Sequence, residues 1–350
     1  MGKRVAIVGT GAVGGYTGGH MARNGVDVTF IDPWPEHVEA MRTKGLRLRG
    51  LTKEESYDVP VKAMHITEVQ NLAKQKPIDV AIISTKSYDT EWAAAMIKQY
   101  LAPEGFCVSL QNCINEERLA KVVGWGRVVG CIASTISVEL QEPGLIQRGV
   151  PLRGDKYTVY RCGEPHGRIT KRVEEVVEWF KCADSAKATA NLWGERWSKL
   201  VMNSSHNGLS ACTGFSGNQM ATDDTARRLS IRLSAETIRV GKANGFNLEK
   251  IKGFDADDWV KAADGNNALM DAIESSILEG VKERREGQRP SMGQDMAKGR
   301  RTEIDFLNGL VVEKGREAGI ATPANEGIIA AVHKVERGEL PQSPRNIAGI

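Results

Sequence analysis

The chain has 350 residues, of which 41% are hydrophobic and 26% charged, and its formal net charge is +3. This length exceeds that of one typical hydrophobic core and predicts two domains. Because the basic residues are scattered among acidic ones, we expect no nucleic-acid and no membrane partner. No apolar run approaches the roughly 20 residues of a membrane span. The first strand begins at once and the six cysteines have no metal or disulfide spacing, so we expect a cytoplasmic protein without a signal peptide or a metal site.

The first 32 residues predict a strand, a glycine turn, a helix and a second strand that delivers Asp32. The turn has the G-x-G-x-x-G pattern and consists of Gly9, Thr10, Gly11, Ala12, Val13 and Gly14. Its glycines permit a tight turn, a close approach of pyrophosphate to the backbone, and close packing of the helix on the strand. The helix N-terminus offers N–H groups and partial positive charge to phosphate.

Asp32 lies eighteen residues after Gly14, where a carboxylate can accept hydrogen bonds from a ribose diol. The whole arrangement predicts a dinucleotide-binding unit. The alternative is a glycine turn in an α/β protein that binds no nucleotide.

Helices and strands continue to alternate up to about residue 190, which predicts a doubly wound, mostly parallel sheet. We expect helices at 34–44, 88–100 and 169–183, strands at 78–84, 106–110 and 127–137, and shorter β structure at 46–61 and 144–162. Ligands in such sheets lie beyond the carboxyl ends of strands. Lys86 and Asn112, which follow two of the strands, are therefore placed to meet a cofactor or a substrate.

The pattern changes to long helical runs from residue 192 onward. They are expected at 192–209, 222–244, 255–280, 291–319 and 326–338. We predict a Rossmann domain over 1–190, an all-α domain over 191–338, and a loosely held tail over 339–350.

Two groups in the helical part are candidates for chemistry. Lys199, Asn203 and Asn207 are four residues apart and share one helical face. Their alternative role is an interdomain hydrogen-bond network. If 291–319 is one helix, Glu303 lies on its apolar stripe and needs a buried partner, for which Lys199 is a candidate. The alternative here is a structural ion pair.

The chain also resembles the 2-dehydropantoate 2-reductase, or ketopantoate reductase, family up to about residue 338. The matching segments are 9–15, 85–88, 111–112, 197–203, Asn207, 291–295, 299–305 and 319–323. The resemblance implies that Lys199 is the general acid that protonates a ketone as hydride arrives from nicotinamide, with Glu303 as a second catalytic residue. It implies that Asn112, Asn203, Asn207 and Ser291 hold the substrate, and that Lys86 lies near the cofactor. It further implies that the all-α domain over 191–338 is the substrate and dimerisation domain, so we also expect a homodimer.

Two departures from the family pattern shape the expected function. Cys113 replaces the usual glycine after Asn112, and Asp32 stands where a basic residue would meet the 2′-phosphate of NADPH. A carboxylate there favours NAD over NADP. We therefore predict hydride transfer between NAD(P) and a small oxo or hydroxy acid. The alternatives are NAD-dependent catabolic oxidation of another hydroxy acid or alcohol, including the β-hydroxyacid dehydrogenase type, and a non-catalytic NAD(H) sensor.

Overall fold

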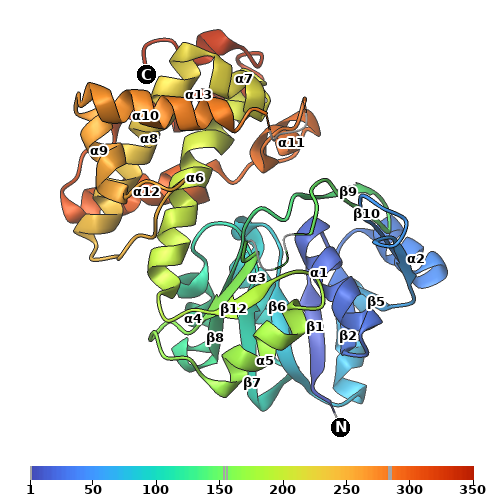
Figure 1. Ribbon diagram of the computed structural model, residues 1–350. Helices are drawn as coiled ribbons and strands as arrows, with labels where there is room; N and C mark the ends of the chain where they lie inside the picture. The colour runs from blue at the N-terminus through green and yellow to red at the C-terminus, as the bar shows by residue number, and fades with distance from the viewer. Residues whose placement is uncertain (1, 153, 155–156, 283–285) are drawn as a thin grey trace. The chain divides into compact units, whose positions relative to one another are not determined.

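The computed structural model describes residues 2–152, 154, 157–282 and 286–350. The chain divides into two compact units, Met1–Leu192 and Trp193–Ile350. The first unit mixes strands and helices, and the second is built from helices (Figure 1). This confirms the predicted fold class, an α/β Rossmann part followed by an all-α part.

The larger sheet of the first unit has the strand order β12-β11-β8-β7-β6-β1-β2-β5 in the described part of the chain. Its strands are β1 (Arg4–Val8), β2 (Asp27–Asp32), β5 (Lys62–His65), β6 (Ile78–Ile83), β7 (Leu101–Ser109), β8 (Val128–Ala133), β11 (Tyr160–Gly163) and β12 (Ala186–Ala188). The neighbouring strands β8, β7, β6, β1, β2 and β5 pair in parallel, whereas β11 runs antiparallel to β8. The parallel part has the doubly wound order, with β1 at its centre.

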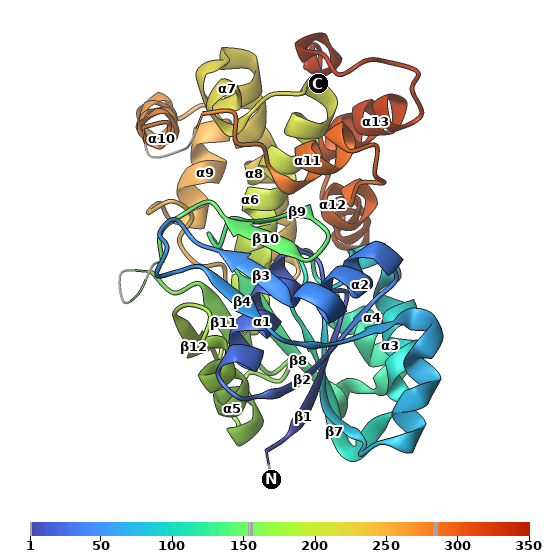
Figure 2. The same cartoon turned by 90° about the vertical axis from the view of Figure 1, so that its right-hand side faces the viewer.

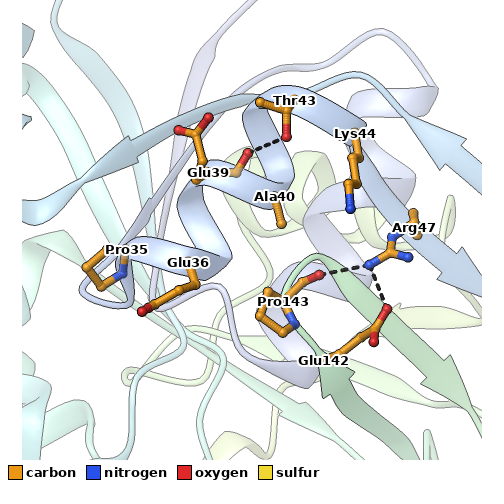
Figure 3. Close-up of a pocket in the computed structure, with 9 residues that line it drawn as sticks. All are labelled: Pro35, Glu36, Glu39, Ala40, Thr43, Lys44, Arg47, Glu142 and Pro143. Carbon is orange, nitrogen blue, oxygen red and sulfur yellow. Dashed lines mark hydrogen bonds and ion pairs between the residues drawn. The ribbon is translucent and has the colours of Figure 1, made fainter.

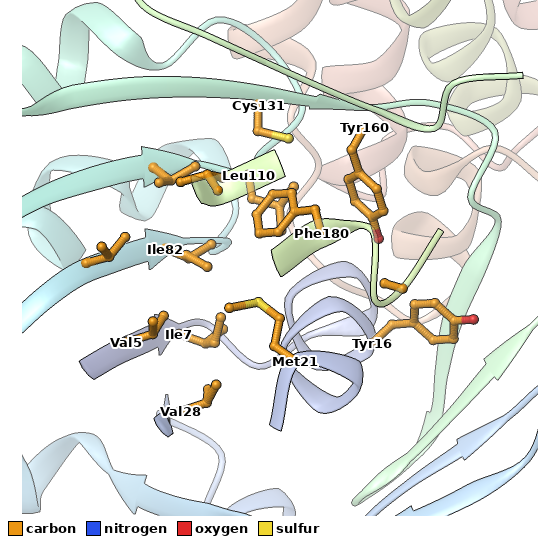
Figure 4. Close-up of a cluster of buried hydrophobic side chains, with 14 of the residues drawn as sticks. Val5, Ile7, Tyr16, Met21, Val28, Ile82, Leu110, Cys131, Tyr160 and Phe180 are labelled. Carbon is orange, nitrogen blue, oxygen red and sulfur yellow. The ribbon is translucent and has the colours of Figure 1, made fainter. Parts of the chain in front are cut away.

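Helices cover both faces of this sheet. Val5 and Ile7 of β1 belong to a buried cluster with α1 and α5 (Figure 4). Ala6 and Val8, which point to the other face, pack with α3 and α4. The helices are α1 (Ala12–Arg23), α3 (Thr90–Lys98), α4 (Glu116–Val123) and α5 (Lys171–Phe180). Because neither face meets water, the strands are apolar at consecutive positions.

A second sheet lies beside α1 in the same unit (Figure 2). It has the order β4-β3-β10-β9. Its strands are β3 (Leu46–Arg49), β4 (Tyr57–Val59), β9 (Val138–Glu142) and β10 (Leu145–Arg148). Strand β3 directly follows helix α2 (Pro35–Lys44), whereas β9 and β10 come much later in the chain. The two regions of short β structure predicted at 46–61 and 144–162 thus meet, because β3 and β10 pair in parallel.

The glycine-rich sequence of α1 lets this helix fit between the two sheets. A Cβ atom on Gly18 would lie 2.7 Å from Phe30 of the larger sheet, and one on Gly19 would lie 2.9 Å from Leu46 of the second. Real Cβ atoms do not approach other atoms so closely, so larger side chains would push a sheet away.

The second unit contains only helices as regular elements within its described residues. They are α6 (Leu192–Thr213), α7 (Gly217–Thr222), α8 (Asp224–Ala243), α9 (Ala256–Ala263), α10 (Asn267–Glu279), α11 (Ser291–Ala297), α12 (Ile304–Ala318), α13 (Pro323–Glu336) and the 3₁₀ turn η5 (Pro344–Ile347). The buried Trp197 of α6 donates from Nε1 to the Thr237 carbonyl of α8 at 2.7 Å. A Cβ on Gly241 would lie 2.1 Å from that nitrogen, so the glycine lets the two helices approach.

Two of the predicted long helices, 255–280 and 291–319, are wrong, because the structure divides each of them into two shorter helices. Gly265 has φ +103° and separates α9 from α10, which is capped by the Asn266 side chain. Gly299 has φ +63° just after α11. Both glycines adopt the left-handed conformation that ends a helix.

The tail predicted at 339–350 is not loosely held. The Asn346 side chain and the Ser343 N–H donate to the Cys212 carbonyl at 2.9 and 3.0 Å, and Ile347 is buried. These bonds satisfy the end of α6, whose last carbonyls have no partner within the helix.

Candidate active site

The glycine turn joins β1 to α1, and its geometry requires glycine at two positions. Gly9 has φ +87°, and a Cβ there would lie 2.7 Å from the Thr85 nitrogen. A Cβ on Gly14 would lie 2.0 Å from Ser84 Oγ, which donates to the Gly9 carbonyl at 2.7 Å. A Cβ on Gly11 meets nothing within 4 Å. Gly11 is thus not needed for packing within the protein, which fits a position that a ligand approaches.

The first turn of α1 is suited to an anion. Gly11 is the N-cap residue, and no side chain among the described residues caps this end. Ala12 and Val13 are partly exposed, whereas Gly14 is buried. The N–H groups of such a helix start can bind phosphate.

Asp32 ends β2 directly beside this turn. Its Oδ2 accepts a 2.7 Å hydrogen bond from the Thr10 N–H, and its Oδ1 accepts one of 3.0 Å from the Trp34 N–H. The residue is only 8% exposed. The carboxylate therefore shapes the turn, a structural role that the sequence does not reveal.

His37, in the first turn of α2, is a residue of this region that the sequence analysis missed. Its Nε2 lies 2.8 Å from the Thr10 carbonyl oxygen, and its Nδ1 accepts a 2.9 Å hydrogen bond from the Gly144 N–H. The ring is fully buried and stacks on Trp34. Because Gly144 lies 107 residues further along the chain, no local pattern could indicate this contact.

The ends of β6 and β7 carry the other residues predicted for the first unit. Lys86 is half-buried and is the N-cap residue of a short 3₁₀ turn, η2 (Ser87–Asp89). Gln111 is buried and donates from Nε2 to the Thr85 carbonyl at 2.9 Å, which ties the two strand ends together. The partly exposed Asn112 accepts at its carbonyl a 2.9 Å bond from the Asn115 side chain. Cys113 has φ +65° and is 6% exposed, so it adopts a conformation that favours the glycine it replaces.

The candidate residues of the second unit begin on α6. From Gly194 to the end of this helix all residues are buried except Lys199, Met202, Asn203 and His206. Their spacing places them on one stripe. The predicted polar stripe therefore includes Lys199 and Asn203, and the structure adds Met202 and His206.

Asn207 lies beside this stripe and is 5% exposed. Its Oδ1 accepts a 3.1 Å hydrogen bond from Ser291 Oγ and a 3.2 Å bond from the Met292 N–H at the start of α11. The structure thus brings together the predicted residues Asn207 and Ser291. A Cβ on Gly293 would lie 2.2 Å from Ser210 Oγ, so this glycine allows α11 to approach α6.

Glu303 is 3% exposed but is not on a continuous helical stripe as predicted. It is the N-cap residue of α12, since the chain leaves the helical conformation after α11. A carboxylate at a helix N-terminus is favoured by the helix dipole. Its pairing with Lys199 stays a prediction.

Other groups contribute less to a site. Burial raises the pKa of the Cys107 and Cys212 thiols to about 12, which leaves them protonated and unreactive. Among the described residues, no three His, Cys, Asp or Glu side chains are grouped so that they could hold a metal ion. An open groove of about 580 Å³ lies between α2 and the turn from β9 to β10, but none of its lining residues is a predicted site residue (Figure 3). None of the described helices is long and apolar enough to cross a membrane.

Comparison with known proteins assigns this combination of units. The family model described as Ketopantoate reductase PanE/ApbA matches residues 5–154, and the model of the C terminal part of the same family matches residues 191–336. The chain belongs to the ketopantoate reductase family. It is thus an oxidoreductase of a family that uses a nicotinamide cofactor, and the predicted resemblance is confirmed.

Individual relatives match this family member over nearly their full lengths. The 2-dehydropantoate 2-reductase of Pyrococcus horikoshii is 30% identical over 326 residues, which are 92% of this chain and 94% of the relative. The PanE/ApbA family ketopantoate reductase from Ralstonia eutropha JMP134 is 27% identical and has a TM-score of 0.77, with 96% and 99% of the two chains covered. A D-mandelate dehydrogenase solved with NADH and anilino(oxo)acetate shares the fold, with a TM-score of 0.78 at 21% identity and coverage of 96% and 98%.

Proposed function

We propose that this ketopantoate reductase family member transfers hydride between NAD(H) and the carbonyl or alcohol carbon of a small 2-oxo or 2-hydroxy acid. The observation that carries the proposal is the stripe on α6. It leaves the Lys199 amine and the Asn203 carboxamide partly exposed, beside Met202 and His206, on a helix whose other residues are buried from Gly194 onward. Buried helices rarely present such groups without a functional or structural partner.

The cofactor is proposed to bind at the glycine turn. Its pyrophosphate would meet the N–H groups at the start of α1, where the Cβ position of Gly11 is open. Asp32 would accept hydrogen bonds from the ribose diol, and its charge would repel a 2′-phosphate. This supports a preference for NAD over NADP. Lys86 and Asn112, at the ends of β6 and β7, are proposed to lie near the nicotinamide end.

Lys199 is proposed as the proton donor and Glu303 as the second catalytic residue. Hydride transfer to a ketone builds negative charge on oxygen, and a positioned ammonium group relieves it by giving up a proton. In the oxidation direction, which NAD commonly serves, the neutral amine would take the alcohol proton. The nicotinamide supplies the hydride, and the protein orients the reactants.

Four side chains are proposed to hold the substrate: Asn112, Asn203, Asn207 and Ser291. The hydrogen bonds to Asn207 Oδ1 support this for one of them, because they orient its amide. With the oxygen turned toward Ser291 and Met292, the Nδ2 donor points the other way. A donor in that place suits the carboxylate of an oxo acid.

The decisive experiment measures turnover of a panel of 2-oxo acids with NADH and NADPH, and of the matching hydroxy acids with NAD and NADP. We expect Lys199→Ala to lower kcat by about 10²-fold or more with little change in the affinity for NADH. Lys242→Ala is a matched control, since that lysine forms an exposed ion pair with Asp257 in the same unit. Near-normal turnover by the Lys199 variant would remove this residue from the mechanism. Binding of NADH by a wild-type protein that turns over no member of the panel would favour a sensor.

Two further expectations stay predictions. Light scattering of the purified protein tests the homodimer, and cell fractionation tests the cytoplasmic location. A monomer at micromolar concentration, or recovery with membranes, would contradict them.

A further inference from the structure

The His37 ring connects three segments of the first unit. It lies on α2, one of its nitrogens contacts the glycine turn at Thr10, and the other contacts Gly144 in the turn from β9 to β10. Gly144 is also bonded to the neighbouring strand, because its carbonyl accepts a 2.8 Å hydrogen bond from the Arg47 N–H. Its φ of +71° is one that favours glycine. The partner of His37 is therefore held in place by a second hydrogen bond.

These contacts select one form of the ring. The Gly144 N–H can only donate, so Nδ1 must be an unprotonated acceptor. The Thr10 carbonyl can only accept, so Nε2 must carry the proton and donate. His37 is thus a neutral imidazole in a single tautomer, with both nitrogens satisfied.

Thr10 is held from two sides as a result. Its N–H donates to Asp32 Oδ2 at 2.7 Å, and its carbonyl accepts from His37 Nε2 at 2.8 Å. Its hydroxyl is buried and has no hydrogen-bond partner among the described residues. The polar contacts that hold this residue therefore come through its backbone, from Asp32 and His37.

We propose that His37 is a positioning residue for dinucleotide binding. By fixing the Thr10 carbonyl, the ring sets the direction of the following N–H groups, which would face the pyrophosphate. This inference rests on the proposed function, in which the glycine turn binds the dinucleotide. It adds that affinity depends on a histidine that never touches the ligand, and through it on the turn from β9 to β10.

Two substitutions separate the two contacts of the ring. In His37→Gln the amide reaches the place of Nε2 and can donate to the Thr10 carbonyl, whereas in His37→Asn it reaches only the place of Nδ1 and can accept from Gly144. His20→Asn is the matched control. His20 is also a buried histidine of this unit, and its ring nitrogens have no hydrogen-bond partner among the described residues.

The measurements are the Kd of NADH by fluorescence titration, the split between KM and kcat, the thermal midpoint, and hydrogen exchange of the amides of residues 9–15. We expect His37→Asn to raise Kd and KM for NADH about tenfold or more with kcat within about twofold, and to speed exchange in the turn. His37→Gln should retain most of the affinity and protection. His20→Asn should lower the thermal midpoint without changing Kd.

Three outcomes would overturn the inference. They are unchanged affinity in both His37 variants, equal losses in the Asn and Gln variants, and a loss in His20→Asn as large as that in His37→Asn. If the wild-type protein binds neither NADH nor NADPH, the proposed function fails instead. The exchange measurement still tests the positioning of the turn in that case, because it needs no ligand.

Discussion

Gly11 and Gly14 lie in the same turn, but we expect their substitution by alanine to have different effects. The new methyl group of Gly11→Ala meets nothing within 4 Å. The backbone angles of Gly11, φ −68° and ψ −165°, are open to any residue. In Gly14→Ala the methyl group would lie 2.0 Å from Ser84 Oγ and 2.7 Å from the Gly9 carbonyl oxygen.

The magnitudes follow from these distances. At position 11, the gain from a stiffer unfolded chain and the loss of a favourable N-cap glycine are each about 0.5–1 kcal/mol and offset one another. The thermal midpoint should therefore stay within a degree or two. At position 14 overpacking costs about 1–3 kcal/mol, which lowers the midpoint of a unit of this size by roughly 2–12 °C.

The affinity for NADH should not follow stability, because the substitution that leaves stability unchanged, Gly11→Ala, is the one expected to weaken binding. We expect Gly11→Ala to raise the Kd of NADH at least about tenfold, equivalent to 1.4 kcal/mol, because its methyl group would enter the space proposed for the pyrophosphate. Differential scanning fluorimetry and NADH titration of both variants test this. A Gly11→Ala protein with unchanged stability and unchanged affinity would refute the placement of the pyrophosphate at this turn.

Three further predictions concern single residues. Asp32→Asn keeps an acceptor for the Thr10 N–H but removes the charge, so the NADP/NAD ratio of kcat/KM should rise about tenfold; an unchanged ratio would leave Asp32 with a structural role. Cys113→Gly should relieve about 1 kcal/mol of left-handed strain and raise kcat/KM for ketopantoate, whereas Cys113→Ala retains the strain and shows whether bulk alone matters; equal activity of all three proteins would contradict a steric role. Burial, with the charges of Arg23 and Arg148, lowers the pKa of His20 from 6.5 to about 4. As the pH falls, the unfolded state therefore binds a proton before the folded state does. The free energy of unfolding should thus fall by about 3 kcal/mol between pH 6.5 and pH 4. Chemical denaturation of His20→Phe across this range should give a flatter curve, and a curve parallel to that of the wild type would count against the buried neutral ring.

The parts of the fold that rest on local patterns were predictable. Consecutive apolar residues at 80–83 indicated a strand covered on both faces, and the glycine turn indicated the helix that follows. The pairing of β3 with β10 was not predictable, because strands of four residues about a hundred positions apart leave no local signal. The short strand β12 was missed for a similar reason, since Ala186–Ala188 is too short to show a period.

The residues of the candidate site also differ in whether a local pattern could predict them. Spacing alone placed Lys199 and Asn203 on one helical face, since that depends on 3.6-residue periodicity. It failed for Glu303, because a single glycine at 299 could be either tolerated within a helix or used to end it. It also gave no hint of His37 or of the two backbone N–H groups on Asp32, which depend on contacts between distant segments.

The hydrogen bond between His37 and Gly144 also has a consequence for biosynthesis. The glycine turn leaves the ribosome before the turn from β9 to β10, which follows about 134 residues later. At about 5–20 residues per second, that delay is roughly 7–27 seconds. During this time β3 lacks its neighbour β10, and its exposed edge is open to non-native pairing. A nascent chain that ends before Gly144 would thus carry the complete glycine motif without the hydrogen bond that Gly144 gives to the His37 ring.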